Sequence, residues 1–345
     1  MKVLIASTIV PFIEGGGTFI VDWLDAMLRE RGHEVEVLKI PFWSHFRAMP
    51  SQMLALRLLD ISEHGDRLIA IRPPAYLLRH PAKVLWFIHH HRGAYDLWGT
   101  EYQDLPNTPE GLAYREAIVK SDHLAFGEAR SIYTNSAVVA NRLKKYNDVD
   151  AEVLYPPIFR PERYRCDGYG DYILFISRIA HHKRQHLAVE AMQFTKTPVK
   201  LVIAGKADEP DCERIVRNAV EEFGVQNKVI IRSDWIREEE KVKYFAGCLA
   251  ALYIPFDEDS YGYPSLEAHH AHKSVISTTD AGGTAELIVD SHNGFLVEPA
   301  PKAIAEKMDH LYRDRSLARK MGEAGNRRLT ELGITWDRVV ERLLA

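Results

Sequence analysis

Several features that mark common functional classes are missing from this chain. It contains only three cysteines, Cys166, Cys212 and Cys248. Their spacing fits neither a disulfide framework nor a zinc site, and it suits a reducing, cytoplasmic environment. No run of about 20 apolar residues is present, so no helix is expected to span a membrane. The apolar stretch at residues 1–8 is too short for a secretory signal peptide.

An excess of charge of one sign is also lacking. The formal net charge is −4 over 345 residues, and a division near residue 165 leaves neither half with more basic than acidic residues. Because nucleic-acid-binding proteins usually carry a basic excess, we expect no nucleic-acid partner. Any membrane contact is expected to be weak, local and peripheral.

The chain does contain enough apolar sequence for two domains. Apolar residues make up 46% of it, and its length exceeds what a single core usually organises. Short apolar runs alternate with helical periodicity in both halves, which is typical of parallel sheets built from βαβ units. Strands are predicted at residues 2–7, 34–40, 67–71, 83–88, 131–134 and 151–154, and again at 172–176, 199–204, 229–232, 250–253, 275–277 and 295–297. Helices are predicted at 18–31, 186–192, 238–247 and 265–272.

A stretch with three prolines and two glycines at residues 155–170 separates the two series and is predicted to be a linker. The predicted fold is α/β, with two Rossmann-like, doubly wound domains, residues 1–165 and 166–345, facing each other across a cleft. In such sheets, ligands bind beyond the carboxyl ends of the strands. Motifs at those positions are therefore the candidates for chemistry.

A glycine run follows the first predicted strand. Gly15, Gly16 and Gly17 precede the helix at 18–31. Glycine lets the backbone approach a ligand closely, and a helix N-terminus favours an anion. The run is not the Gly-x-Gly-x-x-Gly fingerprint, which disfavours a nicotinamide-dependent dehydrogenase. A flexible loop without a ligand is the alternative interpretation.

Two cations follow the predicted strand at 172–176. Arg178, as a bidentate fork, and Lys183, as a point charge, are suited to neutralising a diphosphate beyond the carboxyl end of that strand. The alternative interpretation is a solvated basic loop.

An acidic turn follows the predicted strand at 250–253. The segment Asp259-Ser-Tyr-Gly-Tyr-Pro-Ser-Leu-Glu267 carries a carboxylate at each end, and Pro264 suits the first turn of a helix. Carboxylates accept charge-assisted hydrogen bonds from pairs of sugar hydroxyls. An acidic loop held by the helix dipole is the alternative. A further glycine turn, Gly282-Gly283, follows the strand at 275–277.

Together these motifs resemble glycosyltransferase family 4, which has the GT-B fold. The family shows a glycine-rich first loop, an Arg-x4-Lys pair, a Glu-x7-Glu turn and a Gly-Gly-x-x-Glu turn. The matches run in the same order over nearly the whole chain: Gly15–Gly17, Arg178 with Lys183, Asp259 through Glu267, Gly282 through Glu286, and Trp336, which is similar to the aromatic that opens the family's last helix. The sequence departs from the pattern at Asp259, where Glu is usual, and at Ser177, His270, His272 and Ser274.

The resemblance implies a retaining transferase that moves a hexose-type sugar from a nucleoside-diphosphate donor to a saccharide or glycolipid acceptor, with no cofactor and no metal. It implies that the first domain binds the acceptor and the second the donor, with the last helix packing back on the first. By resemblance, the catalytic residues are His89 (alternatively His90 or His91), Arg178, Lys183 and Asp259. Donor-binding residues are Gly15, Gly16, Gly17, Arg178, Lys183, Trp235, Ile236, Asp259, Tyr261, Gly262, Tyr263 and Glu267, with Glu267 on the ribose and Trp235-Ile236 at the base.

Aromatic residues outside the predicted strands of the first domain indicate an acceptor site, since aromatic rings stack on the C–H faces of sugars. The candidates are Trp43, Tyr95 and Trp98, from a group that also includes Phe12, Phe42, Phe46 and Tyr102. Packing in the core or loops is the alternative. A saccharide or glycosylated lipid carrier would suit assembly of a surface polysaccharide or glycolipid on the cytoplasmic side.

Histidine runs at residues 89–91, 181–182 and 269–272 invite a metal interpretation. A metal site needs further convergent ligands and a second shell, and the sequence selects none, so no metal site is predicted. Two alternatives to a transferase remain on the same fold, because fold does not fix function. They are a sugar-nucleotide epimerase and a non-catalytic sugar-nucleotide-binding protein.

Overall fold

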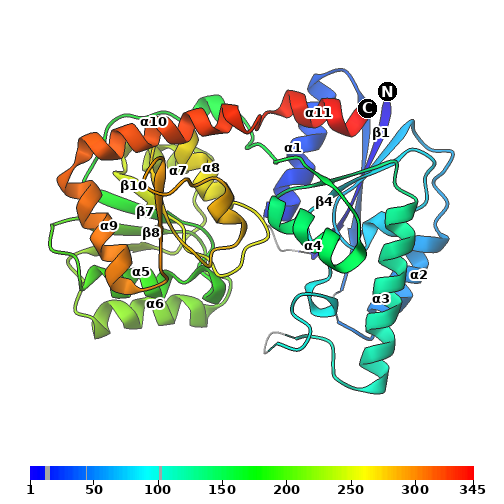
Figure 1. Ribbon diagram of the computed structural model, residues 1–345, viewed down its shortest axis with the longest axis horizontal. Coiled ribbons are helices and arrows are strands. Elements are labelled where there is room, and N and C mark those ends of the chain that lie inside the picture. The colour runs from blue at the N-terminus through cyan, green and yellow to red at the C-terminus, as the bar shows by residue number, and fades with distance from the viewer. Residues whose placement is uncertain (12–15, 44, 101–102) are drawn as a thin grey trace. The chain divides into compact units, whose positions relative to one another are not determined.

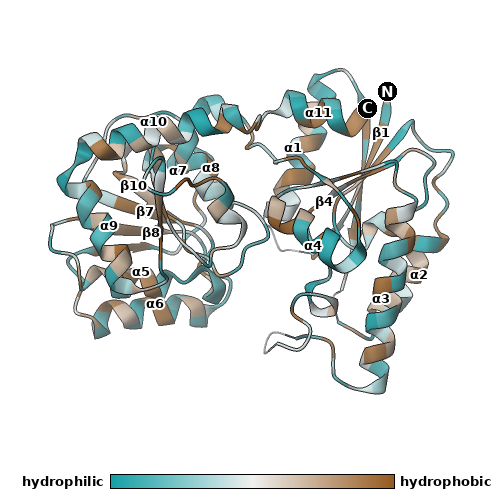
Figure 2. Ribbon diagram, in the orientation of Figure 1, coloured by the Kyte–Doolittle hydropathy of each residue, from teal (hydrophilic) through white to brown (hydrophobic). Residues whose placement is uncertain are grey.

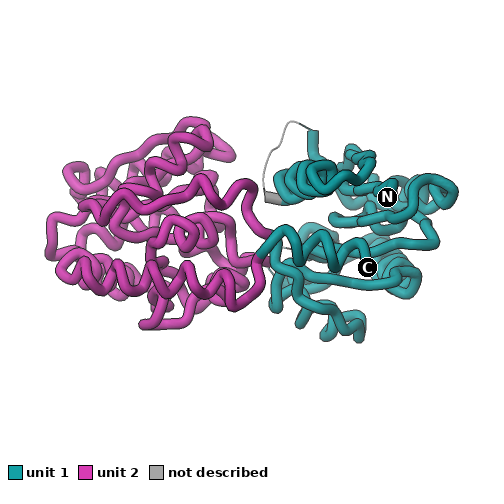
Figure 3. Tube along the Cα trace, turned by 90° about the horizontal axis from the view of Figure 1, so that it is seen from above, with its two compact units in different colours: residues 1–156, 335–345 teal, residues 157–334 magenta. Residues whose placement is uncertain are grey.

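The computed structural model describes residues 1–11, 16–43, 45–100 and 103–345, and it divides into two compact units (Figures 1 and 3). Unit 1 comprises Met1–Pro156 and Thr335–Ala345, and unit 2 comprises Pro157–Ile334. Each unit contains a six-stranded parallel sheet flanked by helices. The α/β class with two Rossmann-like domains is therefore confirmed.

Unit 1 is built on a fully parallel sheet. Its strands are β1 (Lys2–Ile9), β2 (Glu34–Pro41), β3 (Arg67–Ala70), β4 (Lys83–Phe87), β5 (Ser131–Thr134) and β6 (Glu152–Val153), and its helices are α1 (Gly16–Glu30), α2 (Met49–Leu58), α3 (Pro109–Gly127), α4 (Ala137–Asn147) and α11 (Trp336–Leu344), with 3₁₀ turns η1 (Ala75–Leu77) and η2 (Arg92–Ala94). The strand order is β2-β1-β3-β4-β5-β6. Strands β1, β3 and β4 are almost wholly buried, as a parallel sheet covered on both faces requires.

The last helix of the chain, α11, packs against α1 within unit 1. Trp336 opens it and meets Trp86 of β4 edge-on, with the ring centroids 6.4 Å apart. Arg31, just beyond the end of α1, forms an ion pair with Asp337. Unit 1 therefore consists of two separate stretches of sequence. Its last helix, α11, follows unit 2 in the sequence but packs in unit 1.

Unit 2 has the same architecture. Its strands are β7 (Tyr172–Ile176), β8 (Lys200–Ala204), β9 (Val229–Arg232), β10 (Ala250–Leu252), β11 (Val275–Thr278) and β12 (Gly294–Val297), and its helices are α5 (Gln185–Met192), α6 (Pro210–Glu222), α7 (Glu238–Gly247), α8 (Tyr263–His270), α9 (Pro301–Arg313) and α10 (Arg315–Glu331), with 3₁₀ turns η3 (Pro161–Arg163), η4 (His181–Lys183) and η5 (Gly283–Glu286). The order β12-β11-β10-β7-β8-β9 puts β7 and β10 side by side at the centre. In Figure 1, α5 and α6 lie on one side of this sheet and α8 and α10 on the other.

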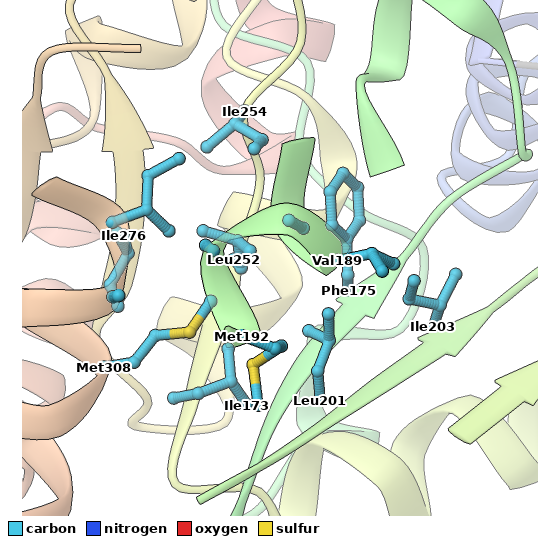
Figure 4. Close-up of a cluster of buried hydrophobic side chains, with 14 of the residues drawn as sticks. Ile173, Phe175, Val189, Met192, Leu201, Ile203, Leu252, Ile254, Ile276 and Met308 are labelled. Carbon is cyan, nitrogen blue, oxygen red and sulfur yellow. The ribbon is translucent and has the colours of Figure 1, made fainter. Parts of the chain in front are cut away.

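The core of unit 2 fixes the strand ends that carry the candidate site. Val189 and Met192 of α5 lie against Phe175 of β7 and Leu201 and Ile203 of β8, and all five are fully buried (Figure 4). In Figure 2 the strands β7, β8 and β10 are hydrophobic, whereas α10, on the other side of the sheet from α5, is largely hydrophilic. Close packing holds these strands at one register, so the loops after β7, β8 and β10 start from defined positions.

The division between the units lies at 156/157, whereas the sequence placed it at 165/166. The reason is that part of the predicted linker packs on unit 2. Tyr164 is buried, its ring meets that of Phe245 at 5.9 Å, and its hydroxyl donates a hydrogen bond to Glu267. Proline content identified the linker, but not which unit would bind its second half.

Candidate active site

The two predicted diphosphate cations both follow β7, and each already has an acidic partner. The guanidinium of Arg178 donates from Nη1 to both carboxylate oxygens of Asp208, at 2.8 and 2.7 Å. Lys183, only 7% exposed, donates from Nζ to Tyr253 Oη at 2.7 Å and to Glu258 Oε1 at 2.5 Å. The sequence singled out both cations but neither of their carboxylate partners.

The pair of Lys183 and Glu258 is charged at neutral pH. Burial alone would lower the pKa of Lys183, but its neighbours Tyr253 and Glu258 raise that pKa above its usual value. Burial likewise opposes ionisation of Glu258, yet Lys183 holds the pKa of Glu258 below its usual range. An ammonium group is therefore retained in a nearly closed environment, where an incoming anion interacts with it more strongly than in water.

A third cation in this region, Arg184, has a structural role that the sequence did not reveal. Its guanidinium donates to both oxygens of Asp280, each at 2.7 Å, and to the hydroxyl of Thr278. It also donates to the carbonyl oxygens of Ile254 and Pro255. These bonds fix the loop after β10 to the end of β11, so the charge of Arg184 is neutralised within the fold.

The acidic turn after β10 depends on a glycine. Gly262 has a φ of 71°, and a Cβ atom there would lie 2.1 Å from Cε1 of Tyr253. Only glycine accommodates both the left-handed backbone and the tyrosine ring. Because Tyr253 also binds Lys183, this glycine couples the shape of the turn to the position of the cation. Helix α8 begins at Tyr263, directly after it.

The glycine turn after β11 closes on the same acidic loop. The backbone N–H of Gly283 donates to the carbonyl oxygen of Glu258 at 2.9 Å. Gly282 has a φ of 63°, and a Cβ atom there would lie 2.4 Å from that oxygen. The two turns that the sequence identified separately are therefore one structural element, and it holds Glu258 beside Lys183.

The two carboxylates of the Asp259-to-Glu267 segment lie in different surroundings. Asp259 is half-buried in the loop before the turn. Glu267 is 3% exposed, near the middle of α8, and its Oε1 accepts hydrogen bonds from Lys241 Nζ at 2.6 Å and from Tyr164 Oη at 3.0 Å. Tyr261 is fully buried and Tyr263 partly so. The sequence predicted Glu267 but missed Lys241 and Tyr164, which lie on other elements.

The residues predicted for the base follow β9. Trp235 is 56% exposed, and Ile236 beside it is half-buried. An exposed indole offers a face for stacking without further rearrangement. Their role stays a prediction.

In unit 1, the predicted glycine run is only partly within the described residues. Gly15 lies outside them, Gly16 begins α1, and Gly17 follows. A Cβ atom at Gly17 would lie 3.3 Å from Cδ of Arg72, which follows β3. Glycine thus gives a basic side chain room beside the start of α1, a feature that the sequence did not indicate.

Of the three histidines after β4, the structure separates one from the others. His90 is 1% exposed, and its Nε2 donates to Asn147 Oδ1 at 2.9 Å, so its ring belongs to the core. His89 is half-buried, and its Nδ1 donates to the carbonyl oxygen of His90 at 2.7 Å. Burial lowers the pKa of His89 to about 4. A neutral His89 ring therefore keeps Nε2 as a hydrogen-bond acceptor, which suits a sugar hydroxyl. His91 lies beside Asp104.

The three predicted acceptor residues differ in exposure. Trp43 is 65% exposed and stacks on His45 at 5.0 Å between ring centroids. Trp98 is half-buried, with the guanidinium of Arg115 over its ring at 4.9 Å. Tyr95 is buried, and its hydroxyl donates to Asp122 at 2.7 Å. Tyr95 is thus a core residue rather than a free stacking surface, and Trp43 and Trp98 remain the candidates.

The described ranges contain neither a cluster of metal ligands nor a membrane-spanning helix. Within them, no group of three or more His, Cys, Asp or Glu residues is arranged to hold a metal ion. No helix in the same ranges is long and apolar enough to cross a membrane.

Comparisons with known proteins identify sequence relatives among the glycosyltransferases. Residues 162–328 match the family described as glycosyl transferases group 1. The chain is 29% identical over 301 residues to the human protein Alpha-1,3/1,6-mannosyltransferase ALG2, covering 77% of this chain and 68% of that protein. It is 22% identical over 234 residues to the O-antigen chain mannosyltransferase C of Escherichia coli, covering 67% of this chain and 60% of that protein.

The fold has a known counterpart as well. Sucrose-phosphate synthase from Thermosynechococcus elongatus superposes with a TM-score of 0.77 at 16% identity, covering 99% of this chain and 97% of that one. The resemblance drawn from the ordered motifs is confirmed: residues 162–328 match the group 1 glycosyltransferases, the sequence relatives are glycosyltransferases, and the fold is GT-B.

Proposed function

We propose that this glycosyltransferase moves a hexose-type sugar from a nucleoside-diphosphate donor to a hydroxyl group of a saccharide or glycolipid, with retention of configuration and without a metal ion. The observation that carries the proposal is the set of charged side chains after β7 and β10 of unit 2. Arg178 and Lys183 supply two positive charges, and Glu267 supplies a buried carboxylate. This combination matches a ligand with an anionic diphosphate and a neutral, hydroxyl-rich ribose.

In this proposal, donor binding is an exchange of partners. The side chain of Arg178 is 43% exposed and meets the diphosphate first, giving up Asp208. Lys183 lies deeper, paired with Glu258, and takes a phosphate oxygen in place of that carboxylate. Both cations then stabilise the negative charge that develops on the leaving diphosphate. As the bond from the sugar to the diphosphate breaks, the acceptor hydroxyl attacks on the same face and gives its proton to the departing phosphate oxygen, so the configuration is kept and no protein base is required.

The same charges support a reaction without metal. A metal ion in such enzymes would neutralise phosphate oxygens, and here an ammonium and a guanidinium are available for that task.

We propose a location in the cytoplasm, because a reducing compartment suits the three cysteines, which are all unpaired.

Mannose is the first donor sugar to test. The human relative is named as an Alpha-1,3/1,6-mannosyltransferase and the Escherichia coli relative as an O-antigen chain mannosyltransferase. The family-level departure at Asp259, where the carboxylate is one methylene shorter than the usual Glu, falls at the position that would contact the sugar.

The test is a thermal-shift panel of nucleoside diphosphates and their sugars, followed by turnover with saccharide acceptors. A ligand at a hundred times its dissociation constant should add about 2.7 kcal/mol to the unfolding free energy. We expect stabilisation by one nucleoside diphosphate, release of that diphosphate only when acceptor is present, and unchanged turnover in chelator. Isomerisation of the donor without acceptor would indicate an epimerase, and complete loss in chelator, restored by a divalent ion, would refute the metal-free reaction.

A further inference from the structure

The buried carboxylate of Glu267 is held asymmetrically. Both of its hydrogen bonds within the described residues, from Lys241 Nζ at 2.6 Å and from Tyr164 Oη at 3.0 Å, end on Oε1. None of the hydrogen bonds found among those residues ends on Oε2, and that atom is not sealed from solvent. One oxygen is thus occupied by the protein, and the other is left for a ligand.

The two groups that hold Oε1 remain donors at neutral pH. Burial alone would lower the pKa of Lys241, but Glu267 and Glu238 raise it above its usual value. Burial raises the pKa of Tyr164 far above its usual value, and Glu267 acts in the same direction. Lys241 therefore stays an ammonium and Tyr164 a phenol, so neither can release Oε1 by losing its proton.

A carboxylate has about four lone-pair positions, two on each oxygen. With two donors on Oε1, that oxygen is saturated, whereas Oε2 keeps both of its positions. Two lone pairs on a single oxygen match two hydroxyl groups on adjacent carbons, such as those of a ribose ring. If either donor were removed, the carboxylate could rotate, and the remaining protein donor could then bind Oε2 instead of Oε1.

We propose that Tyr164 and Lys241 are positioning residues that orient Glu267 Oε2 toward the vicinal hydroxyls of the donor ribose, and that they thereby make the enzyme selective for ribonucleotides over 2′-deoxyribonucleotides. The inference rests on the proposed function, in which Glu267 holds the ribose. Tyr164 belongs to the segment after the unit boundary, and Lys241 belongs to α7. The proposed selectivity of Glu267 on α8 for ribonucleotides therefore depends on two residues outside that helix.

The experiment measures affinities by calorimetry for UDP and GDP, for their 2′-deoxy counterparts and for inorganic pyrophosphate. The variants are Tyr164→Phe, which keeps the ring beside Phe245 and removes only the hydroxyl, and Lys241→Met. Matched controls lose similar bonds of unit 2 that do not end on Glu267: Tyr172→Phe, whose hydroxyl donates to the Tyr244 carbonyl of α7 at 2.7 Å, and Lys228→Met, whose Nζ binds Thr195.

The wild-type protein should prefer the ribonucleotide at least about tenfold, the value expected for one charge-assisted hydrogen bond. In Tyr164→Phe and Lys241→Met this preference should fall several-fold toward one, while pyrophosphate affinity stays at the wild-type value. Lys241→Arg, which restores a donor, should recover part of the preference. Both controls should keep the wild-type ratio.

Two results would overturn the inference: a ribose preference that survives in both variants, or a parallel loss of pyrophosphate affinity, which marks general damage to the fold. Glu267→Gln separates this outcome from failure of the proposed function. If that variant loses nucleotide affinity while Tyr164→Phe and Lys241→Met do not, only the positioning role is refuted. If Glu267→Gln changes nothing, or the wild type binds neither nucleotide, the proposed donor site itself is refuted.

Discussion

Arg178 and Lys183 should respond differently to substitution, although both are proposed to bind the same diphosphate. The side chains of Arg178 and Asp208 are 43% and 31% exposed, and such a pair contributes about 0–1 kcal/mol to stability. The side chains of Lys183 and Glu258 are 9% and 21% exposed. Removing one partner of a buried pair costs about 3–5 kcal/mol, because the other charge is left uncompensated. We therefore expect Lys183→Met to destabilise unit 2 and Arg178→Met to leave its stability nearly unchanged.

Thermal unfolding converts these energies into temperatures. For a unit of this size, 1 kcal/mol corresponds to about 2–4 °C, so Lys183→Met should lower the melting temperature by about 6–20 °C and Arg178→Met by less than about 4 °C. The double variant Lys183→Met/Glu258→Gln removes both charges and should regain most of the loss. In turnover assays at a temperature where all variants are folded, each single variant should lose roughly 10- to 150-fold in kcat/KM, the value of one charge-assisted hydrogen bond.

Three outcomes would contradict this reasoning. A Lys183→Met protein that melts at the wild-type temperature would mean that the buried pair contributes nothing. Wild-type kcat/KM in both single variants would mean that neither cation touches the donor. A double variant less stable than Lys183→Met would show that Glu258 has another essential partner.

Three further predictions concern the other candidate residues. Glu267→Gln should weaken binding of the nucleoside diphosphate itself by about tenfold or more, whereas Asp259→Asn should weaken only the sugar-bearing donor; equal effects on the free diphosphate would contradict the split. Burial lowers the pKa of His90 from 6.5 to about 4. Between these two pH values the imidazole is protonated in the unfolded chain but neutral in the folded one. The free energy of unfolding should therefore fall by about 3 kcal/mol as the pH is lowered from 6.5 to 4. Denaturant titrations of wild type and His90→Phe should show a shallower pH dependence in the variant. Trp43→Ala and Trp98→Ala should raise the acceptor KM without changing donor affinity; unchanged acceptor kinetics would make both rings structural.

Local chemistry allowed much of the site to be predicted from the sequence. Strand ends could be located because a parallel sheet needs continuous apolar runs, and β7 was placed at its observed bounds. Gly262 stood in a motif where its lack of a side chain is required, and the structure gives the reason in the ring of Tyr253. Such features depend on a few residues that are close in sequence, so they can be predicted from the sequence alone.

The partners of these residues were not predictable in the same way. Glu258 pairs with Lys183, and Lys241 with Glu267, across gaps in sequence that carry no periodic signal. Tyr164 was predicted to lie in the linker. The proline content marks the boundary between the two units, but it does not indicate against which unit the tyrosine ring will pack. Tyr95 was equally ambiguous, since an aromatic ring outside a strand serves a binding surface or a core, and only the buried Asp122 decides for the core.

The position of α11 has a consequence for how this chain can be dissected. Because the polypeptide leaves unit 1 at Pro156 and returns to it at Thr335, unit 2 is topologically an insertion within unit 1. Residues 157–334 form one contiguous segment, whereas residues 1–156 alone lack the helix whose Trp336 packs on Trp86. Deleting the C-terminal residues should therefore unfold the amino-terminal half of the sequence first, and a circularly permuted chain that joins residue 345 to residue 1 and opens within unit 2 would keep unit 1 continuous.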